Sequence, residues 1–453
     1  MRINRTITAS AWMAMALLAL CFAPGAHATS DSDRKVEQMQ KKLDQSLELI
    51  KQLAARVQTL EAQVAKQPAQ GAAPQVAQNP PPPANAQPAA PPANADQQRI
   101  EALEQQVSQI AAGSSRANDE LGMPMHGFAD VGLGNHNAQY PEYQGFDIAE
   151  LDFFLTPTLG PHTRALFELN FEVGEDGAVG VDLERAQIGY QFSDQATVWL
   201  GRFHTPFGFY NTAFHHGQEI ATSLRRPRFL EFEDHGGVFP AHTVGGWLAG
   251  NERFGDDQKV TYDVFVGNSQ RITGGLIDMN NPGNTSGNMI FGGNLGYLPG
   301  GLLDGLKVGV SAFSTRIDNQ DVNPESYIRV NNYGLYGDYE TDHWEALAEA
   351  YIFDNKDLTT NHQTHKSDAG FVQVGYREGH FVPYARLERA ALQQSDDYFF
   401  YQNYGQSYIR RALGFRYDID SKSAFKAEVA DTKITDRDPR TFNEALIQYA
   451  IRF

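Results

Sequence analysis

The sequence closes with Ala445-Leu446-Ile447-Gln448-Tyr449-Ala450-Ile451-Arg452-Phe453. Every second residue is apolar (Ala, Ile, Tyr, Ile, Phe), and the residues between them are Leu, Gln, Ala and Arg. Because successive side chains of a β-strand point to opposite faces, this stretch predicts a strand with one apolar face and one mixed, largely polar face.

Similar alternation recurs along the chain from residue 124 onward, without helical segments that would cover the apolar faces. A second clear example is 164–172, where Ala165, Phe167, Leu169 and Phe171 alternate with polar residues. Strands of about ten residues with this pattern are typical of a transmembrane β-barrel with a wet interior. Charged side chains are then expected in the lumen, because a lipid-facing Arg or Lys near the midplane costs about 2–4 kcal/mol.

Sixteen strands are predicted, an even number, as in most closed bacterial barrels. Their ranges are 126–134, 145–155, 163–172, 181–192, 196–203, 241–250, 259–268, 288–297, 304–315, 330–339, 343–353, 369–378, 381–390, 406–417, 423–431 and 442–453. The connections after odd-numbered strands are mostly long, 204–240 above all, and those after even-numbered strands are mostly short. This alternation predicts external loops and periplasmic turns, with both ends of the barrel domain in the periplasm.

Residues 1–28 have the pattern of a secretory signal peptide. Arg2 and Arg5 precede a short apolar stretch, and Ala26-His27-Ala28 fits a cleavage site. The single cysteine, Cys21, lies within this segment, so we expect a mature protein without cysteine chemistry. Lipidation at Cys21 is the less favoured alternative.

A periplasmic arm is predicted between the signal peptide and the barrel domain at 123–453. Val36, Leu43, Ile50, Val57 and Val64 are spaced by seven, which predicts a coiled coil over 31–67. A Pro/Ala-rich linker follows at 68–97, and a short coiled-coil helix at 98–112. A single amphipathic helix is the alternative to the coiled coil, and the heptads leave dimer and trimer open.

The net charge argues against nucleic acid as a partner, and the lack of catalytic motifs argues against an enzyme. The formal net charge is −18, all of it carried by residues 124–453, so nucleic acid is not an expected partner. The sequence has no G-x-S-x-G, H-E-x-x-H or P-loop motif, and we therefore expect no enzyme. A barrel enzyme assembled from distant strands is the rival hypothesis.

Two stretches carry a family resemblance. Leu200-Gly201-Arg202-Phe203-His204-Thr205-Pro206-Phe207-Gly208 and Val260-Thr261-Tyr262-Asp263-Val264-Phe265-Val266-Gly267-Asn268 resemble the phosphate-selective porin O and P superfamily. With its N-terminal coiled coil, the chain is also similar to DcaP-like porins and to LbtU-type siderophore porins. The resemblance implies a trimeric outer-membrane channel whose long loop folds inward and narrows the pore.

The connection 204–240 is the expected selectivity element. It holds Arg225, Arg226 and Arg228, together with His215, His216 and Glu219. Arg presents a fork of donors suited to carboxylate or phosphate, which predicts an anion site. Four wall residues complete the predicted solute-binding set: Arg164, Arg185, Arg386 and Arg410. The alternative is that these charges pair with one another or hold the loop against the wall. With only seven lysines in 124–453, strong phosphate selectivity is not expected.

Five histidines, His204, His215, His216, His235 and His242, flank or occupy the same connection. Histidine is the commonest metal ligand, but no tight ligand spacing appears. We therefore expect no metal and no cofactor.

These observations predict an outer-membrane porin for small hydrophilic solutes, anionic ones among them. The expected partners are outer-membrane lipid, lipopolysaccharide, two further copies of the chain and, through the arm, the cell wall. Siderophore uptake and a structural tether between membrane and cell wall are the alternatives.

Overall fold

The computed structural model describes residues 125–135, 145–157, 159–173, 179–193, 195–215, 219–233, 235–255, 257–278, 287–322, 325–359 and 362–453. The predicted signal peptide, coiled coil, linker and short helix lie outside these residues, as does His216. None of the helices within the described ranges is both long and apolar enough to span a membrane.

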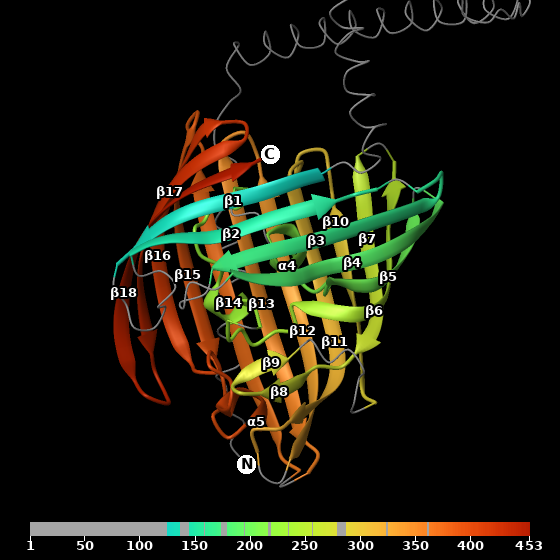
Figure 1. Ribbon diagram of the computed structural model, residues 1–453, viewed down its shortest axis with the longest axis vertical. Helices are drawn as coiled ribbons and strands as arrows, with labels where there is room; N and C mark the ends of the chain where they lie inside the picture. Colours follow the sequence, from blue (N-terminus) through green and yellow to red (C-terminus); the bar gives the residue numbers. More distant parts are fainter. Residues whose placement is uncertain are drawn as a thin grey trace, which may run out of the picture. The chain divides into compact units, whose positions relative to one another are not determined.

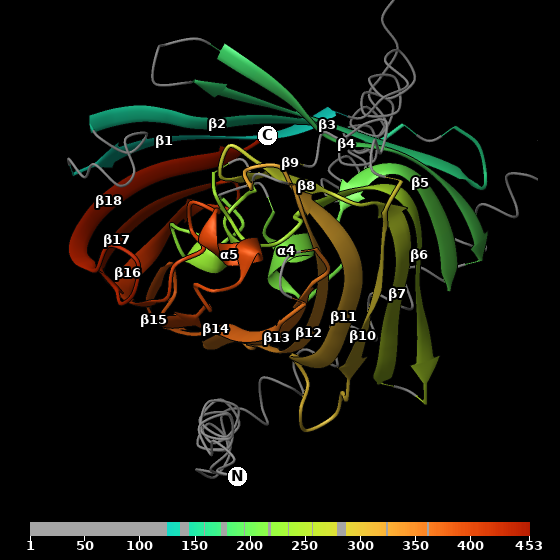
Figure 2. The same ribbon diagram turned by 90° about the horizontal axis from the view of Figure 1, so that it is seen from below.

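Sixteen strands form one closed antiparallel barrel, in which β1 pairs with β18 and β7 pairs with β10 (Figures 1 and 2). The barrel strands are β1 (Met125–Gly134), β2 (Gly145–Leu155), β3 (Thr163–Val173), β4 (Val179–Ser193), β5 (Ala196–His204), β6 (His242–Phe254), β7 (Gln258–Asn268), β10 (Met289–Leu298), β11 (Leu306–Asn319), β12 (Ser326–Glu340), β13 (Trp344–Asp357), β14 (Thr364–Tyr376), β15 (Phe381–Ala391), β16 (Tyr408–Asp420), β17 (Ser423–Ile434) and β18 (Arg440–Arg452). Each overlaps one predicted strand, so the count of sixteen is confirmed.

Exposed apolar side chains alternate with buried polar ones along much of the wall. In β18, Ile447 and Tyr449 are exposed while Glu444 and Gln448 are buried. In β16, Leu413 is 62% exposed and Arg410 is 2% exposed. The alternation that predicted the fold therefore separates an apolar outer surface from an inner face that carries many polar side chains.

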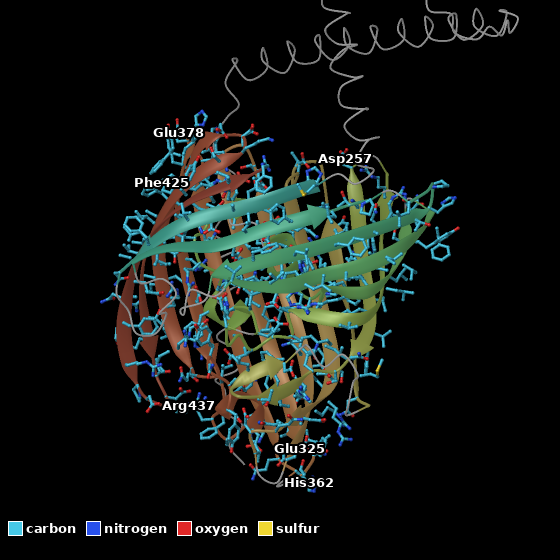
Figure 3. All side chains as sticks on the ribbon, in the orientation of Figure 1. Asp257, Glu325, His362, Glu378, Phe425 and Arg437 are labelled. Atoms are coloured by element: carbon cyan, nitrogen blue, oxygen red, sulfur yellow. The ribbon has the colours of Figure 1, made fainter. Side chains whose placement is uncertain are left out.

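The connections follow the predicted alternation of long loops and short turns. Figure 3 shows Asp257 and Glu378, from two short turns, at one end of the barrel, and Glu325 and His362, from two loops, at the other. β18 runs toward the turn end, where Phe453 exchanges backbone hydrogen bonds with Gly127 of β1. Within the described residues, both ends of the barrel domain thus lie at the turn end.

Two expectations about the loops were wrong in detail. Strands β11 to β14 extend several residues into the predicted loops 316–329 and 354–368. In the extensions of β11 and β12 the outward side chains include the exposed Arg316 and Arg329, while Ile317 and Ile328 are buried, so the apolar-outside pattern ends although the backbone ladder continues. The connection 269–287 also contains a short hairpin of β8 (Arg271–Thr273) and β9 (Leu276–Asp278), and β8 pairs in parallel with β11.

The lumen contains an apolar core, built from loop residues packed on inward-facing aromatic side chains of the wall. The ring of Phe239 lies 4.8 Å from Tyr351 and 4.9 Å from Phe353, both on β13. Phe207 stacks on Phe239 with the ring centroids 4.8 Å apart. The core of this protein therefore lies inside the barrel, between the wall and the connection from β5 to β6.

The outward face offers a direct test of the barrel's orientation in lipid. Leu413, halfway along β16, should tolerate Lys poorly, with a loss of about 2–4 kcal/mol in the free energy of unfolding, because the ammonium would face hydrocarbon. Ile409, on the same face near the end of the strand, should lose about 0–1 kcal/mol on replacement by Lys. Urea unfolding in phospholipid vesicles measures both, and equal losses would contradict a membrane-embedded β16.

Candidate functional site

The connection 205–241 leaves β5 and returns at β6 after crossing the lumen (Figure 2). It contains the helical turns α4 (Tyr210–Ala213) and η2 (Arg228–Leu230). Gly208 has φ +61°, and a Cβ there would lie 1.9 Å from the Tyr351 hydroxyl, so only glycine allows this close approach. The next two amides, of Phe209 and Tyr210, donate to Glu349 Oε1 on β13 at 2.6 and 2.7 Å. The far wall thus caps α4.

Arg226 organises the connection from within. Its Nη1 donates to the carbonyls of Phe214 and His215 at 3.0 and 2.7 Å, and its Nε donates to Leu230 at 2.9 Å. The guanidinium also lies 4.1 Å from the centroid of the Phe232 ring. Since Arg226 is 5% exposed, it acts here as an internal brace that satisfies loop carbonyls.

Arg225 and Arg228 lie against strands β15 and β16. Arg386 Nη1 donates to the Arg225 carbonyl at 2.6 Å, and the Arg228 amide donates to Glu388 Oε2 at 2.8 Å. The Arg228 guanidinium stacks 3.7 Å from the centroid of the Tyr404 ring. The structure brings the three predicted arginines together with predicted Arg386, where loop and wall contact each other.

A buried ladder of alternating charge lies on the wall behind these arginines. Arg386 Nε is 2.9 Å from Glu388 Oε1, and Arg410 Nη2 is 3.2 Å from Glu428 Oε1. Arg410 also pairs with Glu444 on β18. Removing one partner from such a network leaves a buried charge uncompensated, which is strongly destabilising.

The segment around predicted Glu219 is held by a second cationic group on the wall. Arg416 Nη2 pairs with Glu219 Oε1 at 3.0 Å and Arg416 Nη1 donates to the Ala221 carbonyl at 3.2 Å. Lys426 Nζ donates to the carbonyls of Ala221 and Ser223 at 3.1 and 3.2 Å. Wall cations therefore bind the loop chiefly through its backbone carbonyls.

Predicted Arg164 and Arg185 lie elsewhere, on β3 and β4. Arg164 Nη1 donates to the carbonyl of Gly160 at 2.9 Å, and Arg185 pairs with Glu168. The pairing of β3 with β4 shifts register between Glu168 and Leu169, which indicates a β-bulge.

The bulge places on the inner side of the wall a residue that the strand pattern did not predict there. In β4 the exposed apolar residues have odd numbers at first, Val181 and Leu183, and even numbers later, Ile188 and Tyr190. Glu184, at this change of phase, is buried. A change from odd to even apolar positions within one strand is the sequence feature that reveals such a bulge.

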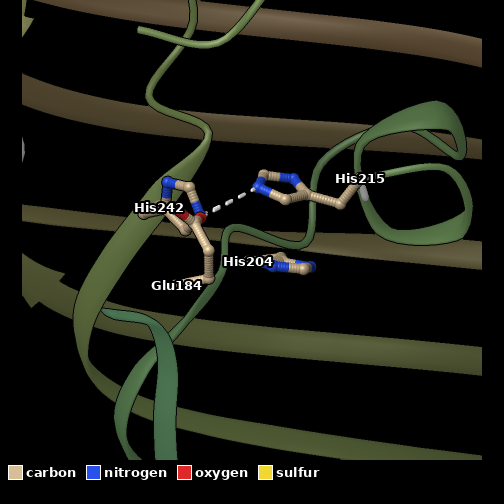
Figure 4. Close-up of side chains that lie close together, drawn as sticks. All are labelled: Glu184, His204, His215 and His242. Atoms are coloured by element: carbon tan, nitrogen blue, oxygen red, sulfur yellow. Dashed lines mark hydrogen bonds and ion pairs between the residues drawn. The ribbon is translucent and has the colours of Figure 1, made fainter. Parts of the chain in front are cut away.

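Glu184 belongs to a buried cluster with three of the histidines (Figure 4). One ligand atom from each of Glu184, His204, His215 and His242 lies within 4.8 Å of all the others. His242 Nε2 is 2.6 Å from Glu184 Oε2 and 2.8 Å from His215 Nε2. The His204 ring stacks 3.5 Å from the His215 ring. These are residue types that can hold a transition metal.

Of the other two predicted histidines, His235 lies outside this cluster. His235 Nε2 lies 3.8 Å from Glu172 Oε2 on β3 and is partly exposed. His216 lies outside the described residues. The candidate site therefore consists of the connection 205–241, the wall charges that hold it, and the four-residue cluster.

A second loop, 392–407, packs on the first and carries α5 (Asp397–Phe400). The Tyr398 hydroxyl donates to the Val238 carbonyl at 2.7 Å. Asp396 caps α5 by accepting from the Tyr398 amide at 3.0 Å, and it also accepts from Asn355 Nδ2 at 2.8 Å. Burial raises the pKa of Asp396 to about 6.

Comparison with known proteins gives structural likenesses only. No protein-family model matches the sequence, and no curated protein matches it. Similar solved structures include a loop-deletion mutant of OmpT, an outer membrane protein of Vibrio cholerae (13% identity, 73% of this chain and 99% of that chain, TM-score 0.49). Others are the outer membrane channel DcaP of Acinetobacter baumannii (12%, 73% and 97%, 0.46) and Salmonella typhi OmpF in complex with daunomycin (13%, 73% and 97%, 0.45). The fold assignment rests on the strand pairing described above.

Arg226→Lys should loosen the connection while keeping its charge, because an ammonium cannot reproduce the fork that contacts three carbonyls. We expect a loss of about 1.5–3 kcal/mol in the free energy of unfolding for each charge-assisted hydrogen bond not replaced. Trypsin cleavage within 219–233 should accelerate, measured by mass spectrometry of the folded protein. Arg253→Lys, at an exposed position of β6, is the matched control and should change neither quantity. Equal cleavage of both variants would contradict the role assigned to Arg226.

Asp396 should make stability depend on pH in acid solution. Its pKa in the folded protein, about 6, exceeds the ordinary value of 3.8, so its contribution is fully present below pH 3.8 and is lost as the pH rises through 6. Asp396→Asn mimics the protonated acid. Between pH 4 and 7 the wild type should therefore lose roughly 2–3 kcal/mol of unfolding free energy relative to this variant, measured in urea. Parallel pH profiles would refute the assignment.

Proposed function

We propose that this protein is an outer-membrane channel that admits small hydrophilic solutes through a barrel narrowed by the connection 205–241. The observation that carries the proposal is the closed sixteen-strand wall with exposed apolar side chains outside and charged side chains inside. A barrel of this size leaves an aqueous interior unless something fills it. Here a loop crosses that interior.

The distribution of charge around the lumen supports transport of polar solutes. Strands β1 to β4 contribute the buried acids Asp130, Asp152, Glu168 and Glu184. Strands β15 to β17 contribute more buried cations (Arg386, Arg410, Arg416 and Lys426) than buried acids (Glu388 and Glu428). The two arcs are neighbours on the wall, separated by β18 alone, and we propose that this uneven distribution of charge favours polar solutes over apolar ones.

Of the three arginines expected to attract anions, Arg225, Arg226 and Arg228, the proposal keeps Arg225 and Arg228. Arg226 contacts loop carbonyls and Arg228 lies on aromatic rings. Arg225 and Arg228 add two positive charges next to β15 and β16, and we propose that this local charge, rather than any free donor, attracts anionic solutes.

The other expectations from the sequence are also part of this proposal. They comprise assembly as a homotrimer, contact with outer-membrane lipid and lipopolysaccharide, a periplasmic arm that reaches the cell wall, and the absence of catalysis. Siderophore uptake and a purely structural tether are the competing functions, and a conducting pore would exclude the tether as the sole role.

Planar bilayers test the proposal. Purified protein should open stable, ohmic channels, and Arg225→Gln/Arg228→Gln should raise the cation-to-anion permeability ratio about twofold, because two positive charges leave the lumen. The reversal potential in a KCl gradient measures this ratio. Arg253→Gln/Arg440→Gln, which removes two exposed arginines at strand ends, should leave it unchanged. A folded protein that never conducts would refute the channel, and an unchanged ratio in the first variant would refute the anion-attracting role.

A further inference from the structure

We propose that Glu184, His204, His215 and His242 form a binding site for a divalent transition-metal ion, of which Zn²⁺ is the representative. The four side chains come from β4, the end of β5, the turn after α4 and the start of β6. All four are buried, with exposed fractions of 2–6%. The proposal stands on their geometry and is independent of whether the barrel conducts.

The orientation of two imidazole rings is set by the partners of their Nδ1 atoms. His215 Nδ1 lies 3.1 Å from the carbonyl oxygen of Asn211, and His242 Nδ1 lies 3.2 Å from Glu233 Oε1. Both partners are acceptors, so each Nδ1 carries a proton in the neutral ring. The Nε2 atoms of both rings then present lone pairs.

Those lone pairs converge on a third acceptor. The two Nε2 atoms lie 2.8 Å apart, and Glu184 Oε2 lies 2.6 Å from His242 Nε2 and 3.8 Å from His215 Nε2. A single proton on His242 Nε2 would have to be shared between Glu184 Oε2 and His215 Nε2, which both lie within hydrogen-bond distance of it. A metal ion accepts from all three atoms at once, and this is the reason to prefer it.

The spacing suits tetrahedral coordination after small adjustments. Zn–N and Zn–O bonds of about 2.0–2.1 Å place the donors of a tetrahedral site roughly 3.3–3.4 Å apart. The distances between 2.6 and 4.8 Å in the cluster lie on both sides of that value. His204 is the candidate fourth donor, but its ring stacks on His215 and its Nε2 lies 3.4 Å from Glu168 Oε2, so it would have to turn toward the ion. Two or three imidazoles with one carboxylate favour Zn²⁺, Co²⁺, Ni²⁺ or Cu²⁺ over Mg²⁺ or Ca²⁺.

The surroundings of the cluster are those of a metal site. A ligating histidine usually donates its second N–H to a carboxylate or a carbonyl, as His242 does to Glu233 and His215 to Asn211. The carboxylates of Glu184 and Glu233 together carry the charge that offsets a divalent ion. The nearby Glu168 is neutralised by its pair with Arg185.

A metal at this point would join four segments of the chain. His204 and His242 are paired residues of the β5–β6 ladder, at the two ends of the connection 205–241. His215 comes from its interior and Glu184 from the wall. The ion would therefore fix α4 near the wall and make the conformation of the connection dependent on metal.

Cobalt spectroscopy tests the site on the full-length protein, purified without a histidine tag, folded in detergent and stripped with a chelator. One equivalent of Co²⁺ should produce the visible absorption of a four-coordinate ion, and Zn²⁺ should displace it. His215→Gln should weaken binding at least tenfold, and Glu233→Gln about 10–100-fold through loss of the orienting carboxylate. His343→Gln, at an exposed turn, is the matched control and should bind as the wild type does.

Two results would overturn the proposal. Absence of the cobalt spectrum in folded wild type would show that a proton, not a metal, occupies the space between the acceptors. Equal weakening by His343→Gln and His215→Gln would show adventitious surface binding. X-ray absorption of the zinc-loaded wild type provides a readout that needs no variant: imidazole scattering from two or more ligands supports the site, and oxygen-only coordination refutes it.

Discussion

The structure depends on one constraint: the backbone polar groups of the connection 205–241 must find partners inside the barrel. Buried amides and carbonyls are costly when unpaired, and this segment crosses the lumen without a sheet neighbour for most of its length. Charged side chains of the wall supply those partners. Glu349 and Glu388 accept loop amides, while Arg386, Arg416 and Lys426 donate to loop carbonyls. The polar inner face is therefore as much a binding surface for the protein's own chain as the wall of a pore.

The wall was predictable because each barrel strand shows, within its own residues, the alternation of apolar and polar side chains. Alternation such as that of 445–453 places apolar residues toward lipid, and all sixteen strands follow from repeating this argument. Strand ends were less predictable, since β11 to β14 continue beyond the apolar belt into polar sequence. There the strands stay paired through backbone hydrogen bonds, which do not require alternating side chains.

The candidate site was predictable only in outline. The sequence predicted that 204–240 is the selectivity element and that its arginines form an anion site, and both statements stay predictions. It did not show that Arg226 would donate to carbonyls of its own loop, because that depends on how the chain folds back over residues 214–230. Contacts such as Arg386 with Arg225 join residues 161 positions apart and leave no local pattern. The position of Glu184 was not predictable from strand alternation, because a bulge in β4 shifts which residues face inward. The three histidines were therefore predicted without this carboxylate beside them.

The pairing of His204 with His242 has a consequence for how such a protein can vary. The two residues are neighbours in the β5–β6 ladder, so the connection leaves and re-enters the wall at a single rung. The register between β5 and β6 therefore does not depend on how many residues the connection 205–241 contains. Changes in the length or composition of the connection can alter the bore and its chemistry while every wall strand keeps its neighbours. The wall and the connection are in this sense structurally separable parts, joined at one rung.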